Sequence, residues 1–277
     1  MTPDELTNAL SIVREVADAA GRLVCAGFRQ QVAVEHKGAI DLVTEYDRAS
    51  EALIREQLGA KLPFAIVGEE EGGALRDGIG FYVDPIDGTT NFVHGHPVWC
   101  ISIGLVERGA PVLGLVLAPA LGIEWSGWAT GEDRSALRRT FASEFLPATS
   151  TPCRLSTTST IAEAYLATGF PYDRRTSDDD NFAAFTTIKK KCLAIRRCGS
   201  AAIDACLVAD GTYDGYWERK VNPYDVAAGS AVVLGAGGRV TDFHGGAGFL
   251  ERGRIVATNG RVHDALLGEL GELAHTG

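Results

Sequence analysis

The feature that most limits the fold is a pair of short apolar runs that each end in carboxylates. Residues 64–67 lead into Gly68 and three glutamates, and residues 81–83 lead into the string Asp84-Pro85-Ile86-Asp87-Gly88-Thr89-Thr90-Asn91-Phe92. Apolar runs of this length, bounded by Gly and Pro, are typical of β-strands. We therefore predict a sheet that carries acidic side chains at the ends of two strands.

Helical periodicity precedes this sheet. Apolar residues recur at three- and four-residue steps through residues 6–24, which predicts a long amphipathic helix. Thr44, with Asp47 three positions later, predicts a capped start to a second helix. Further β-type runs lie at residues 98–106, 111–118 and 123–128. This part of the chain should place two helices on a sheet of several strands.

A second region of mixed structure follows residue 160. Strand-like runs near Tyr165, Ala194, Tyr213, Arg239 and Ile255 alternate with helix-like runs near residues 180–190, 201–208, 223–234 and 262–273. This alternation is typical of an α/β unit. Residues 130–159 have weak periodicity, and we predict a boundary there between subdomains 1–145 and 146–277.

Composition narrows the classes of function. The chain has 277 residues and a formal net charge of -10, the wrong sign for a protein that binds nucleic acid as its primary ligand. Its longest apolar stretch, residues 112–123, is far shorter than a membrane span of about 20 residues. The N-terminus lacks the basic start and apolar block of a secretory signal. We therefore expect a cytoplasmic protein without a membrane segment.

The string after residue 83 has the chemistry of a metal and phosphate site. Pro85 fixes the backbone so that Asp84, Asp87 and the Ile86 carbonyl can converge on a hard cation. Gly88 allows close backbone approach, and the short helix after it has N–H groups that can bind phosphate.

Taken singly, each acidic segment has another interpretation. A D-P-x-D-G string is also a common turn, and the glutamates at residues 69–71 could form a solvated loop. Thr44 and Asp47 could form only a capping box. Residues 222–225, Asn-Pro-Tyr-Asp, could be only the capped start of a helix.

Taken together and in order, these segments resemble the signature of the inositol monophosphatase family, Mg-dependent and lithium-sensitive phosphatases of sugars and polyols. The resemblance extends over nearly the whole chain. Its motifs are Asp41-x-x-Thr44-x-x-Asp47, Gly68-Glu69-Glu70, the string at 84–92, Gly199-Ser200-Ala201-Ala202 and Asp225-x-Ala227-Ala228-Gly229. Tyr224 stands where the family usually has Trp, and Lys37 lacks its usual sequence context, so we leave Lys37 out of the site.

The resemblance implies a layered αβαβα sandwich of the sugar phosphatase type, of α+β or α/β class, with the metal site between two subdomains. It implies two to three Mg²⁺ ions. Glu69, Asp84 and the Ile86 carbonyl would hold one ion, Asp84, Asp87 and Asp225 would hold a second, and Glu69 would help bind a weaker third.

The resemblance also implies roles for the remaining residues. Glu69 and Thr89 would orient the attacking water, with Thr44 and Asp47 in support. Gly88 and Thr89 would bind the phosphate. Asp87, Ala201 and Glu218 would contact the hydroxyls of a cyclic polyol.

The predicted activity is Mg-dependent hydrolysis of inositol monophosphate by direct attack of a metal-activated water. Histidinol phosphate is the nearest alternative substrate, and another sugar phosphatase activity, of the fructose-1,6-bisphosphatase type, uses the same chemistry. A non-catalytic regulatory protein that binds a partner is the alternative from another class. The resemblance further implies a homodimer, a small-molecule phosphate ester as substrate, and inhibition by lithium.

Two basic groups are open to interpretation. Arg134, Arg138 and Arg139 could receive a second anionic group of the substrate, although a solvated basic face is the favoured interpretation. Lys189 to Lys191, with Arg196 and Arg197, are interpreted as a solvated cluster balanced by the acids at 178–180.

Overall fold

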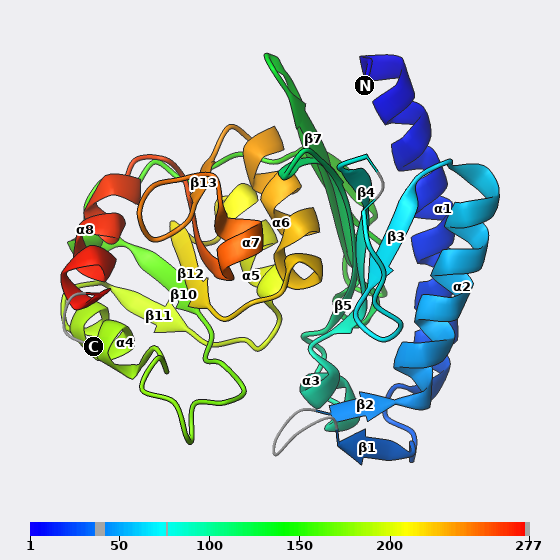
Figure 1. Ribbon diagram of the computed structural model, residues 1–277, viewed down its shortest axis with the longest axis horizontal. Helices are drawn as coiled ribbons and strands as arrows, with labels where there is room; N and C mark the ends of the chain where they lie inside the picture. Colours follow the sequence, from blue (N-terminus) through cyan, green and yellow to red (C-terminus); the bar gives the residue numbers. More distant parts are fainter. Residues whose placement is uncertain (37–41, 76, 275–277) are drawn as a thin grey trace.

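Five layers, alternately helical and sheet, make up the molecule (Figure 1). The structure is a computed structural model that describes residues 1–36, 42–75 and 77–274. From right to left in Figure 1 the layers are α1 (Pro3–Gly27) with α2 (Glu45–Lys61), a seven-stranded sheet, α5 (Ala201–Ala209) with α6 (Pro223–Gly235), a five-stranded sheet, and α4 (Phe182–Lys189) with α8 (His263–Ala274). The predicted αβαβα sandwich is confirmed.

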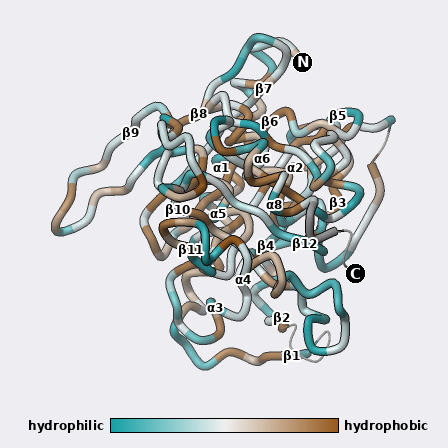
Figure 2. The backbone as a smooth tube through the Cα atoms, turned by 90° about the vertical axis from the view of Figure 1, so that its left-hand side faces the viewer, coloured by the Kyte–Doolittle hydropathy of each residue, from teal (hydrophilic) through white to brown (hydrophobic). Residues whose placement is uncertain are grey.

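The seven-stranded sheet has the order β3-β4-β5-β6-β7-β8-β9, so neighbours in the chain are neighbours in space. Its strands are β3 (Ala65–Gly68), β4 (Ile79–Asp87), β5 (Cys100–Glu107), β6 (Ala110–Ala118), β7 (Ile123–Thr130), β8 (Asp133–Thr140) and β9 (Thr149–Pro152). β3 and β4 are parallel, and the later pairs are antiparallel. Figure 2 shows β3 and β9 at opposite edges of this sheet.

The long first helix covers the outer face of this sheet. The predicted stripe on α1 is buried, with Leu6, Val13 and Ala20 fully buried, and packs with apolar side chains of β4, β5 and β6. Burying each large aliphatic side chain contributes about 1.5–3 kcal/mol. Thr2 and Glu5 form a capping box that starts the helix.

The five-stranded sheet has the order β11-β10-β12-β14-β13. Its strands are β10 (Tyr165–Thr168), β11 (Ala194–Arg196), β12 (Gly215–Arg219), β13 (Arg239–Thr241) and β14 (Arg254–Thr258). β10 is parallel to both β11 and β12, whereas β14 is antiparallel to β12 and β13. The alternation of strands and helices predicted after residue 160 is therefore confirmed.

The middle layer brings the two halves together because small residues meet there. A Cβ atom added at Gly104 would lie 2.6 Å from the Ala228 nitrogen, and one at Gly114 would lie 2.2 Å from the Ala228 oxygen. Gly104 and Gly114 face each other on β5 and β6, so the backbone of α6 lies directly on the sheet. This close packing fixes the N-terminal end of α6 relative to β4.

Residues 130–159 contain more structure than their weak periodicity indicated. β8 and β9 both lie in this segment and extend the seven-stranded sheet. Arg138 and Arg139 on β8 pair with Asp210 and Glu124, so their charges are matched within the protein. The division at residues 145 and 146 stays a prediction. The seven-stranded sheet includes β9, and β10 is the first strand of the five-stranded sheet in chain order.

The remaining elements are short connections. They are β1 (Val34–His36), β2 (Leu42–Thr44), α3 (Thr89–Val93), α7 (Phe249–Arg252) and the 3-10 turns at Pro119–Leu121 and Ile161–Glu163. Among the described residues, no helix has both the length and the apolar character needed to span a bilayer.

Candidate active site

A β-bulge at the end of β4 turns two carboxylates to one side. Asp84 pairs with Ser102 and Asp87 pairs with Cys100, so β4 has one residue more than β5 between these pairs. Side chains alternate between faces along a regular strand, and residues three apart would point to opposite faces. The extra residue in the bulge brings the Asp84 and Asp87 side chains to the same face of the sheet. Pro85 lies in the bulge, where its missing N–H leaves no ladder partner unsatisfied.

The loop after β3 holds Glu69 beside β4. Glu69 donates its backbone N–H to the Val83 carbonyl at 3.2 Å, because β3 and β4 are parallel and end at the same edge. The buried Glu51 carboxylate accepts the backbone N–H groups of Glu70 and Glu71 at 2.7 and 3.0 Å. Arg55 pairs with Glu51 at 2.8 Å and donates to the Ile66 carbonyl. The Glu51–Arg55 pair therefore fixes the loop that contains Glu69, Glu70 and Glu71.

The capping box of α2 connects to the phosphate loop. Asp47 accepts the Thr44 N–H and hydroxyl with Oδ2, at 2.7 and 2.6 Å. Its Oδ1 accepts the Thr89 hydroxyl at 3.1 Å. The same hydroxyl lies 3.0 Å from the Ile86 carbonyl. Thr44 and Asp47 are thus placed behind Thr89, and the hydrogen bond to Asp47 orients the lone pairs of the Thr89 oxygen.

Gly88 makes the turn from β4 into α3. Its φ of +96° lies in the left-handed region, which side chains other than hydrogen disfavour. A Cβ atom there would also lie 3.0 Å from the Val98 oxygen and 3.1 Å from the Gly199 oxygen. Asn91 donates its side-chain amide to the Val98 and Cys198 carbonyls at 2.6 and 2.9 Å. The loop therefore packs against the segment that precedes α5.

Asp87 connects the two halves of the molecule. Its Oδ2 accepts the Ser200 hydroxyl at 2.6 Å and the Ala202 N–H at 2.8 Å, and its Oδ1 accepts the Ala201 N–H at 3.3 Å. Carboxylates are stabilised at helix N-termini by these N–H groups and by the helix dipole. The end of β4 therefore caps α5, which belongs to the other half.

The C-terminal half supplies two further predicted acids. Asp225 lies in the first turn of α6, and its Oδ2 accepts the Asn222 N–H at 2.6 Å. Glu218 lies on β12, and its Oε2 accepts the Tyr216 hydroxyl at 2.6 Å. Glu218 also packs so closely on Gly169 that any Cβ there would clash with its carboxylate.

These residues line one cavity of about 110 Å³, which we call the acidic cavity. The predicted residues that line it are Glu69, Asp84, Ile86, Asp87, Gly88, Thr89, Ala201, Glu218 and Asp225. Thr44 and Asp47 lie behind it and reach it through Thr89. Lys37 and Asp41 lie outside the described residues. Apart from these two, the structure brings the sequence-predicted residues together from both halves of the chain.

The carboxylates of this cavity raise one another's pKa. Burial is the largest cause for Asp84, and repulsion from Glu69, Asp87 and Asp225 adds to it. Burial also raises the pKa of Asp87, although its hydrogen bonds to Ser200 and to α5 oppose this. The pKa of Asp225 is raised by burial and by Asp87. Such a group of acids favours protons or a cation at its centre.

The donor set fits Mg²⁺. Within the described residues, no group of three or more Asp, Glu, His or Cys side chains could hold a metal ion with its side chains as they stand. Asp87 and Asp225 are each held by backbone N–H groups while lining the same cavity. Carboxylates and a carbonyl are the ligands that Mg²⁺ prefers, and a cation among them would offset the repulsion that raises their pKa values. Glu69, Asp84, Ile86, Asp87 and Asp225 could hold it.

Among the residues that line the cavity without having been predicted as site residues are Asp204 and Arg197. Asp204, in α5, lines the cavity with a buried Oδ1 that has no hydrogen-bond partner among the described residues. Burial, and then repulsion by Glu218 and Asp87, raises its pKa well above the usual value. An acid within the apolar sequence of α5 was the available signal. Arg197, interpreted as part of a solvated cluster, is exposed but also lines the cavity.

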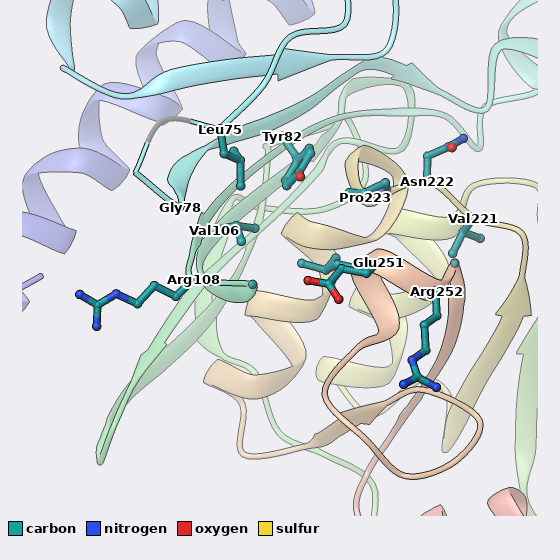
Figure 3. A pocket seen from close by; sticks show the side chains of 13 residues that line it. Leu75, Gly78, Tyr82, Val106, Arg108, Val221, Asn222, Pro223, Glu251 and Arg252 are labelled. Carbon is teal, nitrogen blue, oxygen red and sulfur yellow. The ribbon is translucent and has the colours of Figure 1, made fainter.

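A roomier cavity of about 570 Å³ lies next to the site, between the seven-stranded sheet and α6 with α7 (Figure 3). It shares Val221 and Asn222 with the acidic cavity. Among the described residues that line it, Glu251 is the single acid, with Arg108 and Arg252 nearby. One carboxylate cannot hold paired cations, so the acidic cavity is the candidate active site despite its smaller volume.

Comparisons with known proteins agree with this geometry. The profile of the inositol monophosphatase family matches residues 5–275. The inositol-1-monophosphatase of Synechocystis sp. is 39% identical over 269 residues, covering 96% of this chain and 89% of the relative. The Nus factor SuhB of Pseudomonas aeruginosa is 36% identical over 267 residues, covering 93% and 94%. The solved inositol monophosphatase of Anabaena (Nostoc) sp. superimposes with a TM-score of 0.82 at 36% identity, covering 97% of each chain.

Proposed function

Because the chain belongs to the inositol monophosphatase family, whose members are phosphatases that hydrolyse phosphate monoesters, we propose that its substrate is inositol 1-phosphate. The family is generally Mg²⁺-dependent, and we propose two to three Mg²⁺ ions in the acidic cavity. When bound, Mg²⁺ would neutralise the phosphate charge, make a water nucleophilic near neutral pH and stabilise the leaving oxygen. The observation that carries the proposal is the meeting of Asp84, Asp87, Asp225 and Glu218 at one cavity.

Thr89 and Glu69 would orient the attacking water. The Thr89 hydroxyl has one proton, which it can donate to Asp47 Oδ1 at 3.1 Å. Its oxygen then faces the cavity as an acceptor for a water proton, and Glu69 offers a second acceptor on the same wall. Two fixed acceptors direct the water's lone pair toward the phosphorus, which lowers the entropic cost of attack. No covalent bond to the protein is needed.

Gly88 and Thr89 would hold the phosphate beside this water. Gly88 has no side chain to block the approach of a phosphate oxygen, and its left-handed conformation turns the backbone into α3. Phosphate commonly binds to N–H groups at such turns.

Glu218 and Ala201 would bind the polyol. Burial raises the pKa of Glu218 to about 7, while the Tyr216 hydroxyl and Arg197 lower it. Near neutral pH the carboxyl group can therefore accept a hydrogen bond as a carboxylate or donate one as an acid. Vicinal hydroxyls of a cyclic polyol suit such a partner, since each hydroxyl can donate and accept.

A panel of phosphate esters tests the substrate assignment. We expect kcat/KM for inositol 1-phosphate to exceed the values for histidinol phosphate and fructose 1,6-bisphosphate at matched Mg²⁺ concentration. A higher kcat/KM for histidinol phosphate would show that histidinol phosphate, and not inositol 1-phosphate, is the preferred substrate. The metal and phosphate assignments would stand in that case, because they concern the shared part of the reaction.

We further propose a cytoplasmic homodimer that lithium inhibits. Phe145 and Leu146, in the connection between β8 and β9, are 86% and 69% exposed, and exposed apolar area of this kind suits a subunit contact. Analytical ultracentrifugation tests the dimer, and lithium titration during turnover tests the inhibition. The net charge of -10 supports the expectation that nucleic acid is not the primary ligand.

A regulatory role is the second candidate, because a relative with 36% identity is named a Nus factor. Such a role would act through a protein partner and could coexist with catalysis. Complementation of a deletion strain with Asp87→Asn separates the two roles. Full rescue by a catalytically inactive protein would favour the binding role, and failure to rescue would favour catalysis.

A further inference from the structure

One loop of the C-terminal half lies against the end of β12, where Glu218 faces the acidic cavity. The loop, residues 169–181, connects β10 to α4, and its first four residues line the acidic cavity, so we call it the wall loop. The Glu218 carboxylate packs directly on Gly169, where an added Cβ atom would lie 1.9 Å from Glu218 Oε1. The position of Glu218 therefore depends on where the wall loop lies.

Two ion pairs hold the outer part of the wall loop. They come from the two residues that follow Glu218 in the chain. Arg219 pairs with Asp179, and Lys220 pairs with Asp173 at 2.7 Å. All four side chains are partly exposed, and ion pairs in contact with solvent contribute little to stability. The inner part of the loop must therefore be held by other contacts.

A buried hydrogen-bond network around Asn181 holds the inner part of the wall loop. The Asn181 amide donates to the Gly169 carbonyl at 2.6 Å and to the Thr168 hydroxyl at 2.9 Å. Its Oδ1 accepts the Trp217 indole N–H at 3.0 Å. The Thr168 hydroxyl donates in turn to the Trp217 carbonyl at 2.7 Å. Asn181, Thr168 and Trp217 are all buried. Each polar side-chain group in this network has a partner, and a buried network that is fully satisfied fixes a single arrangement.

Position 181 suits Asn for two reasons. Its φ of +73° lies in the left-handed region, which Asn tolerates better than most residues. Asn181 also immediately precedes α4, where an Asn side chain commonly accepts an N–H of the first turn. Here the Asn181 side chain makes no such bond, and Asp180 Oδ1 accepts the Phe182 N–H at 2.9 Å. The Asn181 amide can therefore serve the network instead of the helix.

The network controls both sides of Glu218. Its bond to the Gly169 carbonyl holds the backbone on which the Glu218 carboxylate packs. Its bond to Trp217 holds the residue that precedes Glu218 in β12. Thr168 pairs with Trp217 across the parallel strands β10 and β12, so the same hydrogen bonds also fix the spacing of these strands. Asn181 does not itself line the acidic cavity, and its effect on a ligand there must be indirect.

We propose that Asn181 is a positioning residue for recognition of the polyol: through Gly169 and Trp217 it holds Glu218 where its carboxyl group meets the substrate hydroxyls. This inference rests on the proposed function and deepens it, because it assigns part of the substrate selection to a buried residue outside the cavity. Among the described residues, the Asn181 side chain bonds to Thr168, Gly169 and Trp217 and to nothing in the phosphate loop. Its loss should therefore weaken binding of the polyol and leave phosphate binding intact.

Two substrates, one with a polyol and one without, test the proposal. Inositol 1-phosphate has ring hydroxyls for Glu218, whereas p-nitrophenyl phosphate has none. Asn181→Asp keeps the oxygen that accepts the Trp217 N–H and removes both N–H donors. We expect KM for inositol 1-phosphate to rise about tenfold, with its kcat and the kcat/KM for p-nitrophenyl phosphate both within about twofold of the wild type.

Coupling to Glu218 tests the route of the effect. If Asn181 acts through Glu218, Asn181→Asp should raise KM by less than about twofold in a Glu218→Gln background. Two effects on KM that simply multiply in the double variant would show that Asn181 does not act through Glu218, and would overturn the inference.

Asn259 provides a matched control. It is a buried Asn of the same half, and its amide donates to the Ser156 hydroxyl at 2.8 Å and to the Thr158 carbonyl at 2.9 Å. It does not line the acidic cavity. Asn259→Asp should destabilise the fold to a similar degree in urea denaturation and leave KM for inositol 1-phosphate unchanged. An equal rise of KM in both variants would show that Asn181 acts on stability alone, which would overturn the inference.

Thr168 gives the same comparison if Asn181→Asp folds poorly. Thr168→Val removes the hydroxyl that connects Asn181 to the Trp217 carbonyl, and it should raise KM for inositol 1-phosphate in the same selective way. Thr168→Ser keeps the hydroxyl and should restore the KM of the wild type. Equal KM values for the Val and Ser variants would count against the network.

The wild type separates this inference from the proposed function. An unchanged KM in a folded Asn181→Asp protein, or an equal loss of kcat/KM with both substrates, would overturn the role of Asn181 and leave the phosphatase function intact. Failure of the wild type to hydrolyse inositol 1-phosphate would contradict the proposed function itself, and this inference with it, before any variant is compared.

Discussion

The two halves of the candidate active site are built in different ways. The half on the seven-stranded sheet takes Asp84, Asp87, Gly88 and Thr89 from six consecutive residues, and a bulge in β4 aims them at one cavity. The C-terminal half takes each group from a separate element: Ala201 and Asp204 from α5, Glu218 from β12 and Asp225 from α6. Most of the first half is therefore local in sequence, with Glu69 added from the loop after β3, whereas the second half depends entirely on tertiary packing.

The halves also differ in how their acids are stabilised. Asp47 and Asp87 each accept several donors from helix starts or hydroxyls. Asp204 has an oxygen with no partner among the described residues, and Glu218 accepts one Tyr hydroxyl. The first half is thus fixed before any ligand binds, whereas the second has hydrogen-bonding capacity left for a substrate. We infer that the first half sets the reaction and the second half sets the substrate.

Removal of Glu51 should disturb the first half most. Glu51→Ala leaves Arg55 with only the more distant Glu71 carboxylate, at 3.5 Å, and removes the acceptor of the Glu70 and Glu71 N–H groups. Breaking a buried pair from one side costs about 3 kcal/mol, and we expect that decrease in the free energy of unfolding, with weaker Mg²⁺ activation. Urea denaturation measures it. Glu56→Ala, at an exposed position of the same helix, should change the free energy of unfolding by less than about 0.5 kcal/mol.

Removal of the Thr89 hydroxyl should reduce catalysis with little effect on folding. Thr89→Val keeps the shape but removes the Thr89 hydrogen bond to Asp47 Oδ1 and one of the two acceptors proposed for the water. We expect kcat to fall about 10²-fold, the lower range for loss of a proton-handling group. Thr89→Ser should restore most of the activity. Equal kcat values for Val and Ser variants would show that the hydroxyl has no role.

Glu218→Gln should act on substrate binding. We expect KM for inositol 1-phosphate to rise about tenfold, as for loss of one charge-assisted hydrogen bond. The pKa of Glu218 is about 7, so the carboxylate form dominates above pH 7 and the acid below it. The change of KM with pH near 7 in the wild type should disappear in the variant. Glu251→Gln, in the cavity of Figure 3, should leave KM unchanged.

Asp204→Asn should have the smallest effect and should stabilise the protein at high pH. A buried Asp with a raised pKa binds its proton more tightly in the folded state than in the unfolded state. Stability is therefore lost as pH rises from the unfolded pKa, near 4, toward the raised folded value. Asn lacks this titration, so the variant should gain about 1 kcal/mol relative to the wild type at pH 8 and less at pH 4. Denaturation at both pH values checks it, and an equal difference at both would be the contrary result.

The same contrast explains what the sequence could predict. The string at residues 84–92 contains several candidate ligands within nine consecutive residues, so it could be recognised from the sequence. The resemblance to the family added Glu69, Asp225 and Glu218 by their positions. Asp204 and Arg197 were not predicted as site residues, because their place depends on how α5 packs on the end of β4. Glu51 and Arg55 have the spacing of an ordinary helix ion pair, which gave no sign of the loop that they hold.

Prediction of the fold from the sequence was limited in a similar way. The helices and strands after residue 160 follow clear alternations of apolar runs, and the structure has them near the predicted positions. β8 was not predicted, because its arginines interrupt the apolar pattern. Glu124 lies opposite Arg139 on the neighbouring strand β7, whereas Asp210, the partner of Arg138, comes from the end of α5, far along the chain. Such partners cannot be read from local periodicity.

The central claim is that the acids at the end of β4 form a Mg²⁺ site that drives hydrolysis. Phosphate release from inositol 1-phosphate, with and without Mg²⁺, in the wild type and in Asp87→Asn, tests it most directly. Asn keeps an oxygen for the N–H groups of α5, and circular dichroism would check that the fold is retained. The account predicts Mg²⁺-dependent turnover in the wild type and its loss in the variant. Turnover without Mg²⁺, or full Mg²⁺-dependent turnover in a folded Asp87→Asn protein, would contradict it.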